Sequence, residues 1–338
     1  MNLYVENDLK ELEKKFVFSN ELKDKTILVT GGTGLIGSLI LRFLSLLNKE
    51  RNLNMTVVGT ARSKEKADAL GMDITWIFCD LTDGISYSGT VDYIIHTASP
   101  TQSYFLANNP VEVIESTVSG ASKLLRFAKD KNTQSVVYLS SMEVYGKNDS
   151  DAPLSEEKLG FIDNLNPRSS YSEGKRLIEC LCSSYAHEYG VNVKIARLTQ
   201  TFGCGIQKED NRVFAQFVRA ALEGTDIVLH TLGESSKNYV YTTDAIRAIF
   251  YILLKGKSAE AYNVANGESY ISIMGMAELV RDEFNKNINI IVDLKDNMGY
   301  APSTKVKLDT AKLENLGWTP FVPLKEMYKR TIAYYKSL

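Results

Sequence analysis

Thr26-Ile27-Leu28-Val29 forms an apolar run typical of a buried strand, and it leads directly into Thr30-Gly31-Gly32-Thr33-Gly34-Leu35-Ile36-Gly37. Apolar residues at helical spacing continue from this turn through residue 44. Glycines at 31, 34 and 37 allow a tight turn, close approach of a pyrophosphate to the backbone amides, and close packing of the helix on the strand. The first turn of such a helix also offers unpaired N–H groups to a diphosphate. The pattern predicts a dinucleotide-binding turn, and a purely structural turn is the alternative.

Strands and helices alternate along the chain as far as about residue 200. Nearly all-apolar runs predict strands at 55–60, 74–78, 91–96, 135–139 and 191–196, and helical spacing predicts long helices at 110–129 and 171–189. Apolar strands that alternate with helices indicate a parallel sheet covered on both faces. We therefore expect an α/β protein with a doubly wound Rossmann sheet.

The pattern loosens after Thr201, where shorter elements follow one another. Helices are expected at 212–223 and 273–285, and strands at 226–229 and 261–264. These lengths suit a smaller C-terminal α/β lobe over the carboxyl ends of the strands, where open α/β sheets bind ligands. The predicted division is an N-terminal extension (1–24), a nucleotide-binding domain (25–202 with parts of 235–265) and a substrate-binding lobe (203–234 and 266–338).

Composition bounds the function further. The formal net charge is −2 and the basic residues are scattered, so we expect neither a nucleic acid nor an anionic membrane as partner. Neither a signal-peptide pattern nor a membrane-spanning apolar stretch is visible, which favours a cytoplasmic location. The cysteines and the three histidines lack metal-site spacing, so no metal is expected.

A second group of residues carries acid–base chemistry. Tyr171 and Lys175 lie four residues apart, hence on one face of the predicted helix, where an ammonium can lower the pKa of a phenol and reach a bound ribose. An ordinary solvated helix face is the alternative. Ser141, at the end of the fifth predicted strand, would offer its hydroxyl to the same substrate oxygen, or else cap that strand. The order of these pieces is the order that one active site requires.

These motifs, together with Asp80-Leu81-Thr82 and Ser140-Ser141-Met142-Glu143-Val144-Tyr145-Gly146, resemble the extended short-chain dehydrogenase/reductase superfamily. Within it the chain resembles the NAD-dependent epimerase/dehydratase group that acts on nucleotide-diphosphate sugars. The resemblance runs from about residue 25 to 335. The segments at 168–176 and 196–203 look like those of UDP-glucuronate decarboxylases.

The resemblance implies a catalytic trio of Ser141, Tyr171 and Lys175, with Glu143 as a further carboxylate. It also implies that the sugar C4 hydroxyl is oxidised first, with Tyr171 as base and the nicotinamide as hydride acceptor. The resulting 4-keto sugar can then lose its carboxylate, lose water, or turn over and be reduced from its other face. The expected enzyme is therefore a decarboxylase-like enzyme or a C4 epimerase.

Three positions depart from the relatives. Met142 stands where dehydratases carry the acid that protonates departing water, which disfavours dehydration. Gln200 replaces an asparagine that contacts substrate in many relatives, and Lys237 replaces an arginine of the decarboxylases. Lysine keeps the charge but loses the two-pronged geometry for a carboxylate or phosphate, which weakens the decarboxylase assignment. The expected substrate contacts are Ser141, Gln200 and Lys237.

The cofactor is expected to be NAD or NADP. Arg62 follows the second strand, where an acidic residue would repel a 2′-phosphate, so it favours NADP; stacking on adenine or pointing to water is the alternative. Asp80 and Leu81 resemble the adenine contact, with a loop cap as the alternative, and Ala98 and Ser99 would line the nicotinamide side. The other expected cofactor contacts are Gly31, Thr33, Gly34, Leu35, Ile36, Gly37, Tyr171 and Lys175.

The sequence also leaves two alternative functions open and predicts an oligomeric state. An NADPH-dependent carbonyl reductase would follow from Arg62 if the cofactor is consumed. A non-catalytic dinucleotide sensor would not need the Tyr-Lys-Ser set. The helices at 110–129 and 171–189 resemble the pair that forms a four-helix dimer interface in the superfamily, which predicts a homodimer.

Overall fold

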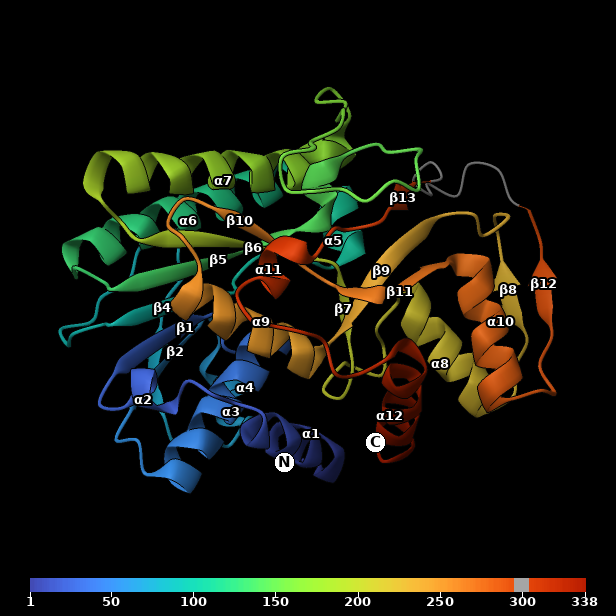
Figure 1. Ribbon diagram of the computed structural model, residues 1–338, viewed down its shortest axis with the longest axis horizontal. Helices are drawn as coiled ribbons and strands as arrows, with labels where there is room; N and C mark the ends of the chain where they lie inside the picture. Colours follow the sequence, from blue (N-terminus) through green and yellow to red (C-terminus); the bar gives the residue numbers. More distant parts are fainter. Residues whose placement is uncertain (295–303) are drawn as a thin grey trace.

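A seven-stranded parallel sheet forms the centre of the computed structural model, which describes residues 1–294 and 304–338 (Figure 1). Its strand order is β10-β6-β5-β4-β1-β2-β3. The bounds are β1 Thr26–Thr30, β2 Thr56–Ala61, β3 Thr75–Phe78, β4 Tyr93–His96, β5 Ser135–Ser141, β6 Val193–Leu198 and β10 Ala261–Val264. The chain builds outward from β1 in both directions, so the prediction of a doubly wound Rossmann sheet is confirmed.

Helices cover both faces of this sheet because successive strand residues point to opposite sides and are apolar on both. Leu28 and Ile94 pack in the core under α6 (Pro110–Asp130) and α7 (Ser170–Tyr189). On the other side, Val29 and its neighbours pack in the core that contains α3 (Leu35–Arg51) and α9 (Thr242–Lys255). The short helix α4 (Lys64–Asp68) lies between β2 and β3, and α5 (Ser103–Asn108) lies between β4 and α6.

Short strands and helices form the second part of the molecule. One sheet has the order β11-β9-β13, with β7 paired to β9, and a two-stranded sheet joins β12 to β8. The strands are β7 Gln200–Phe202, β8 Ile227–Leu229, β9 Ser236–Tyr241, β11 Asn266–Ser272, β12 Ile290–Val292 and β13 Lys305–Val306. The helices are α8 Val213–Glu223, α10 Ile273–Phe284, α11 Ala311–Glu314 and α12 Leu324–Lys336. The predicted strand at 226–229 and both predicted helices are present, whereas β7, β9 and β11 were not foreseen. The strand expected at 261–264 is β10, which belongs to the central sheet and not to the smaller lobe, because it pairs with β6.

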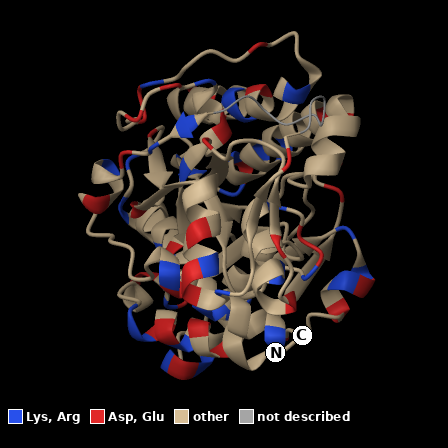
Figure 2. Ribbon diagram, turned by 90° about the vertical axis from the view of Figure 1, so that its right-hand side faces the viewer, with Lys and Arg blue, Asp and Glu red and all other residues tan. Residues whose placement is uncertain are grey.

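The N-terminal segment is part of the core. Helix α1 (Leu3–Lys14) lies beside α3 and α9, and its Leu9 and Leu12 are fully buried, as is Leu22 of the short helix α2 (Ser19–Leu22). The Phe16 ring meets the rings of Phe43 and Phe250 edge to face, at centroid distances of 5.0 and 5.1 Å. The two chain ends lie close together, and charged residues of both signs are interspersed on that side (Figure 2).

Candidate active site

The glycine turn follows β1 and packs against the carboxyl ends of β2 and β4. Gly31 has a φ of +68°, and a Cβ there would lie 2.8 Å from the Ala98 Cα, just beyond β4. A Cβ on Gly37 would lie 2.3 Å from the Gly31 carbonyl oxygen, so α3 packs directly on the turn. The Gly32 N–H donates to the Thr60 carbonyl at the end of β2, at 2.9 Å. Only glycine leaves these backbones room to meet.

Two features of this region fit a dinucleotide. Gly34 is the N-cap of α3 and supplies no side-chain hydrogen bond, so the amides of the first turn, at Leu35 and Ile36, lack a side-chain cap. Thr33 completes the turn. Beside it, the Ser99 hydroxyl is buried and has no hydrogen-bond partner among the described residues, which leaves it for a bound group.

The ends of β2 and β3 carry the residues predicted at the adenine side. Asp80 Oδ1 accepts from the Thr82 N–H at 2.9 Å and from its hydroxyl at 2.8 Å. These bonds lower the pKa of Asp80, and the charge of Arg62 lowers it further. Asp80 thus caps its own loop while lying near Arg62, which is exposed. Leu81 is half-buried and packs closely on Gly120 of α6.

Tyr171, Lys175 and Ser141 converge where β5 ends beside α7. The Lys175 ammonium donates to the Leu139 carbonyl at 2.7 Å and lies 5.6 Å from the centroid of the Tyr171 ring. Burial raises the pKa of Tyr171 above its usual value, and the charge of Glu143 adds to this, whereas a hydrogen bond with Ser141 lowers it. The hydroxyl, phenol and ammonium that were predicted separately therefore form one cluster.

Burial also sets the charge of Lys175 and of the neighbouring His96. It lowers the pKa of Lys175 to about 7, against the opposing charge of Glu179. It lowers the pKa of His96 to about 3, so this ring is neutral, and its Nδ1 lies 2.6 Å from the Thr30 hydroxyl. Lys175 consequently changes charge near neutral pH, where an acid–base site operates.

A buried ion pair between Glu179 and Arg197 lies next to the cluster. Arg197 of β6 donates to both carboxylate oxygens of Glu179, at 3.0 and 2.7 Å. The Ser140 hydroxyl donates to Glu179 Oε1 at 2.5 Å. The pair thus connects β6, α7 and the residue before Ser141. Sequence reasoning missed this pair; the signal available was a glutamate four residues after Lys175, on the same helix face.

Glu143 lies on the open side of the cluster, in the 3-10 helix η1 (Met142–Tyr145). Its Oε2 accepts from the Ser172 hydroxyl at 3.3 Å and lies 3.6 Å from Arg168 Nη1. Burial lowers the pKa of Lys237, and the charge of Glu143 opposes that change, so β9 brings Lys237 near this carboxylate. The neighbouring Met142 is buried, with its sulfur 3.3 Å from the Thr199 hydroxyl.

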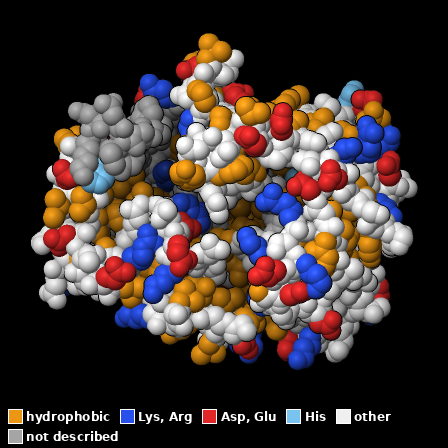
Figure 3. Space-filling view, turned by 180° about the vertical axis from the view of Figure 1, so that it is seen from behind, with side chains coloured by type: hydrophobic (Ala, Val, Ile, Leu, Met, Phe, Trp, Pro, Cys, Tyr) orange, Lys and Arg blue, Asp and Glu red, His pale blue; other side chains and the backbone are white. Residues whose placement is uncertain are grey.

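A cavity of about 590 Å³ continues from Lys237 into the second part of the molecule. It lies among α8, β8, β9 and the start of α10, and Arg219 and Thr231 contribute to its wall. Seen from behind the view of Figure 1, the molecular surface is hollowed near its centre, and Lys and Arg side chains lie around the hollow together with hydrophobic and acidic ones (Figure 3). Gln200 is half-buried on β7, opposite Tyr239 of β9. Lys237 therefore lines this cavity, and its charge interacts with that of Glu143.

No helix in the described ranges, 1–294 and 304–338, is long and apolar enough to cross a membrane. Within the same ranges, no group of three or more His, Cys, Asp or Glu side chains is arranged to hold a metal ion.

A sequence model of the NAD dependent epimerase/dehydratase family matches residues 27–265. UDP-glucuronic acid decarboxylase 1 of Xenopus tropicalis is 29% identical, with 97% of this chain and 78% of that protein covered. UDP-glucuronic acid decarboxylase 6 of Arabidopsis thaliana is 30% identical, with 89% and 85% covered.

Solved structures share the fold. A UDP-glucose 4-epimerase of Thermotoga maritima, solved with UDP-glucose, superposes with a TM-score of 0.77 at 21% identity, covering 92% of this chain and 98% of that one. A dTDP-glucose 4,6-dehydratase of Streptomyces venezuelae, solved with NAD, gives 0.75 at 24% identity, with 92% and 97% covered. At these identities the likeness establishes the architecture alone.

Proposed function

We propose that this chain, which belongs to the NAD dependent epimerase/dehydratase family, is an enzyme that modifies a nucleotide-diphosphate sugar through a transient 4-keto sugar. The observation that carries the proposal is the convergence of Ser141, Tyr171 and Lys175 beside the glycine turn. The names of the relatives support the substrate class, since they include UDP-glucuronic acid decarboxylases and a UDP-glucose 4-epimerase.

The residues around the glycine turn fit NAD, the cofactor in the name of the family. The uncapped first turn of α3 would hold the pyrophosphate, with Gly31 and Gly37 allowing close approach, and Ser99 would face the nicotinamide side. When bound, NAD supplies a nicotinamide that accepts a hydride from the sugar and returns it. We propose NADP as the preferred form from Arg62, which offers a positive charge at the end of β2.

Tyr171 would exchange the proton of the sugar C4 hydroxyl. Because burial raises the pKa of Tyr171, its resting form is the neutral phenol, which can return a proton to a 4-keto oxygen. Taking a proton requires the phenolate, which the hydrogen bond with Ser141 and the nearby Lys175 ammonium favour. Ser141 would also hold the same sugar oxygen.

The nucleotide diphosphate part of the substrate would occupy the cavity next to Lys237. The side chains of Lys237 and Arg219 bring positive charge to it, as a diphosphate requires. Gln200 would contact the sugar from β7. At the reacting end, Glu143 lies near Lys237, and buried Met142 supplies no acid for departing water. We therefore propose decarboxylation of a uronic acid sugar or C4 epimerisation, and not dehydration.

We infer a homodimer that pairs α6 and α7 with their copies. The apolar residues Val111 and Ile114 on α6 and Leu177 on α7 are exposed, at 60, 42 and 51%. Light scattering that shows only a monomer would contradict this assembly. We also infer a cytoplasmic location, because all four cysteines carry free thiols.

The deciding experiment uses the purified protein. Denaturation releases any tightly held dinucleotide, which mass spectrometry identifies as NAD or NADP. The native protein is then incubated with a panel of sugar nucleotides. Loss of carbon dioxide identifies a decarboxylase, unchanged mass with an altered sugar identifies an epimerase, and loss of water identifies a dehydratase. Gain of two hydrogens identifies a reductase. Failure to convert any sugar nucleotide would remove the proposal.

A further inference from the structure

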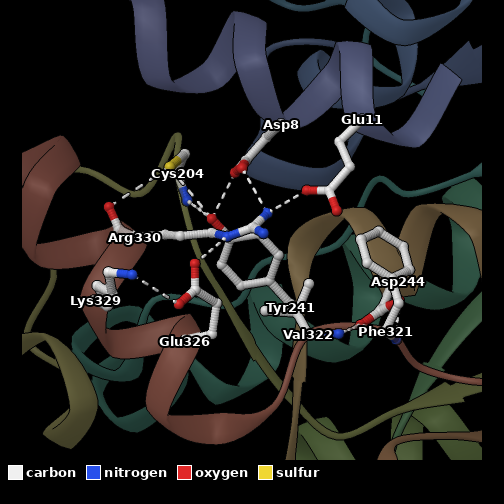
Figure 4. A network of polar contacts seen from close by, with 10 residues as sticks. All are labelled: Asp8, Glu11, Cys204, Tyr241, Asp244, Phe321, Val322, Glu326, Lys329 and Arg330. Carbon is white, nitrogen blue, oxygen red and sulfur yellow. Dashed lines mark hydrogen bonds and ion pairs between the residues drawn. The ribbon is translucent and has the colours of Figure 1, made fainter. Parts of the chain in front are cut away.

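Asp8 lies at the centre of a buried polar network that joins the N-terminal helix to the second part of the molecule (Figure 4). Asp8 itself is 7% exposed, and Tyr241 is fully buried. The Tyr241 hydroxyl donates to Asp8 Oδ2 at 2.5 Å, and the Arg330 guanidinium donates to Asp8 Oδ1 at 3.1 Å. One carboxylate from α1 therefore binds the end of β9 and the middle of α12.

Tyr241 transmits this contact to two strands. It is the last residue of β9 and pairs with Phe202, the last residue of β7. Its phenol oxygen also accepts from the Cys204 N–H, at 3.4 Å, in the turn after β7. In the same turn, a Cβ on Gly203 would lie 2.5 Å from the Tyr241 ring, so the backbone of this turn packs directly against the ring.

Arg330 stabilises the charge on Asp8 and also binds two other carboxylates. Its guanidinium donates to Glu11 at 2.6 Å and to Glu326 at 3.0 Å, and it lies 5.7 Å from the centroid of the Tyr241 ring. Burial raises the pKa of Asp8, and the bonds from Tyr241 and Arg330 oppose that change. Glu11 contacts the same arginine, whereas the hydroxyl of Tyr241 bonds to Asp8, so Glu11 is a matched comparison for Asp8.

The strands that Tyr241 anchors carry the two proposed substrate contacts. Lys237 precedes it by four residues on β9, and Gln200 lies on β7 opposite Tyr239. A strand held at one end cannot slide along its neighbours without breaking that end contact, so the Asp8 bond limits where both side chains lie. The helix that supplies Asp8 precedes the stretch that the family model matches, residues 27–265.

We propose that Asp8 is a positioning residue for substrate binding: helix α1, through Asp8 and Tyr241, holds β7 and β9 in the place where Gln200 and Lys237 meet the sugar nucleotide. The part of this statement that concerns substrate rests on the proposed function. The part that concerns the strands does not.

The test compares three variants of the full chain, D8N, Y241F and E11Q. An amide offers one acceptor oxygen where the carboxylate offers two, so the side chain of D8N no longer accepts from both the Tyr241 hydroxyl and the Arg330 guanidinium. Y241F removes the hydroxyl and keeps the ring, and it provides the test if D8N does not fold. E11Q alters Arg330 alone. Hydrogen exchange of peptides that cover β7 and β9, the KM for the sugar nucleotide, kcat and NAD affinity are measured for each.

We expect D8N and Y241F to speed exchange in β7 and β9 and to raise KM by about tenfold, with kcat and NAD affinity within about threefold of the wild type. E11Q should match the wild type in all four. Unchanged exchange in both folded variants would overturn the proposal, and so would faster exchange spread evenly over the whole chain. If the wild type converts no sugar nucleotide, the proposed function fails, while the exchange measurement still tests the role of Asp8.

Discussion

Replacing Gly37 by alanine would place a methyl group where α3 meets the glycine turn. The new Cβ would lie 2.3 Å from the Gly31 carbonyl oxygen and 2.7 Å from the Thr97 hydroxyl. The carbonyl cannot retreat, because Gly31 itself faces the Ala98 backbone at a distance that leaves no room for a Cβ. The helix must therefore move away from the sheet.

The size of that movement sets the expected effect. An ordinary contact begins at 3.4 Å, so the start of α3 must move by about 1 Å. Overpacking of this kind costs about 1–3 kcal/mol of the free energy of unfolding, which lowers the melting temperature by about 1–4 °C. The amides of the first turn move with the helix, and we expect NAD affinity to fall by at least about tenfold, because their hydrogen bonds to the pyrophosphate lengthen.

Calorimetry measures both quantities, by thermal scanning and by titration with NAD. Gly174 provides the matched control, since it lies in α7 and a Cβ there meets nothing within 4 Å. G174A should raise stability by about 0.5–1 kcal/mol, the difference in helix propensity between glycine and alanine. The reasoning is refuted if G37A binds NAD as tightly as the wild type and melts at the same temperature.

Three further substitutions test the site. Y171F should reduce kcat by about 10²- to 10⁴-fold and leave nucleotide affinity within about threefold; a rate close to that of the wild type in steady-state assays would exclude Tyr171 as the proton carrier. Burial lowers the pKa of Lys175 to about 7, and the charge of Glu179 opposes that change. E179Q removes this charge, so the pKa of Lys175 should fall and the ammonium should lose its proton at lower pH. The basic limb of the kcat/KM profile should move to lower pH, and an unmoved or higher limb contradicts this role. R62A should weaken NADP binding by about tenfold and leave NAD binding within about twofold; equal losses in titrations of both would show that Arg62 does not read the 2′-phosphate.

Local patterns in the chain were enough for the central fold. The apolar strands and the long helices over 110–129 and 171–189 lie within one or two residues of their predicted bounds. In the second part of the molecule, β7 and β13 were not predicted because they contain only three and two residues. Strands this short carry too few side chains to show a period, and pairing with β9 stabilises them instead.

The candidate site divides in the same way. The glycine turn was predicted from its place between a strand and a helix, because a tight turn there requires residues without a Cβ. The spacing of Tyr171 and Lys175 predicted that both lie on one helix face, and the order of the motifs along the chain predicted that they belong to one site. The nearness of Lys237 to Glu143 did not follow, since β9 and η1 are far apart in the chain. The ion pair of Glu179 with Arg197 likewise depends on how α7 packs on β6.

Periodicity and glycine spacing therefore predicted the Rossmann sheet, the tight turn between β1 and α3, and the placing of Tyr171 and Lys175 on one helix face. These features depend on backbone sterics over a few consecutive residues, and every such residue is visible in the sequence. The contact of Asp8 with Tyr241 and the placing of Lys237 beside the acid–base cluster arose from packing between distant elements. A buried charge is tolerated where the fold brings partners to it, and no local pattern states which partners those will be.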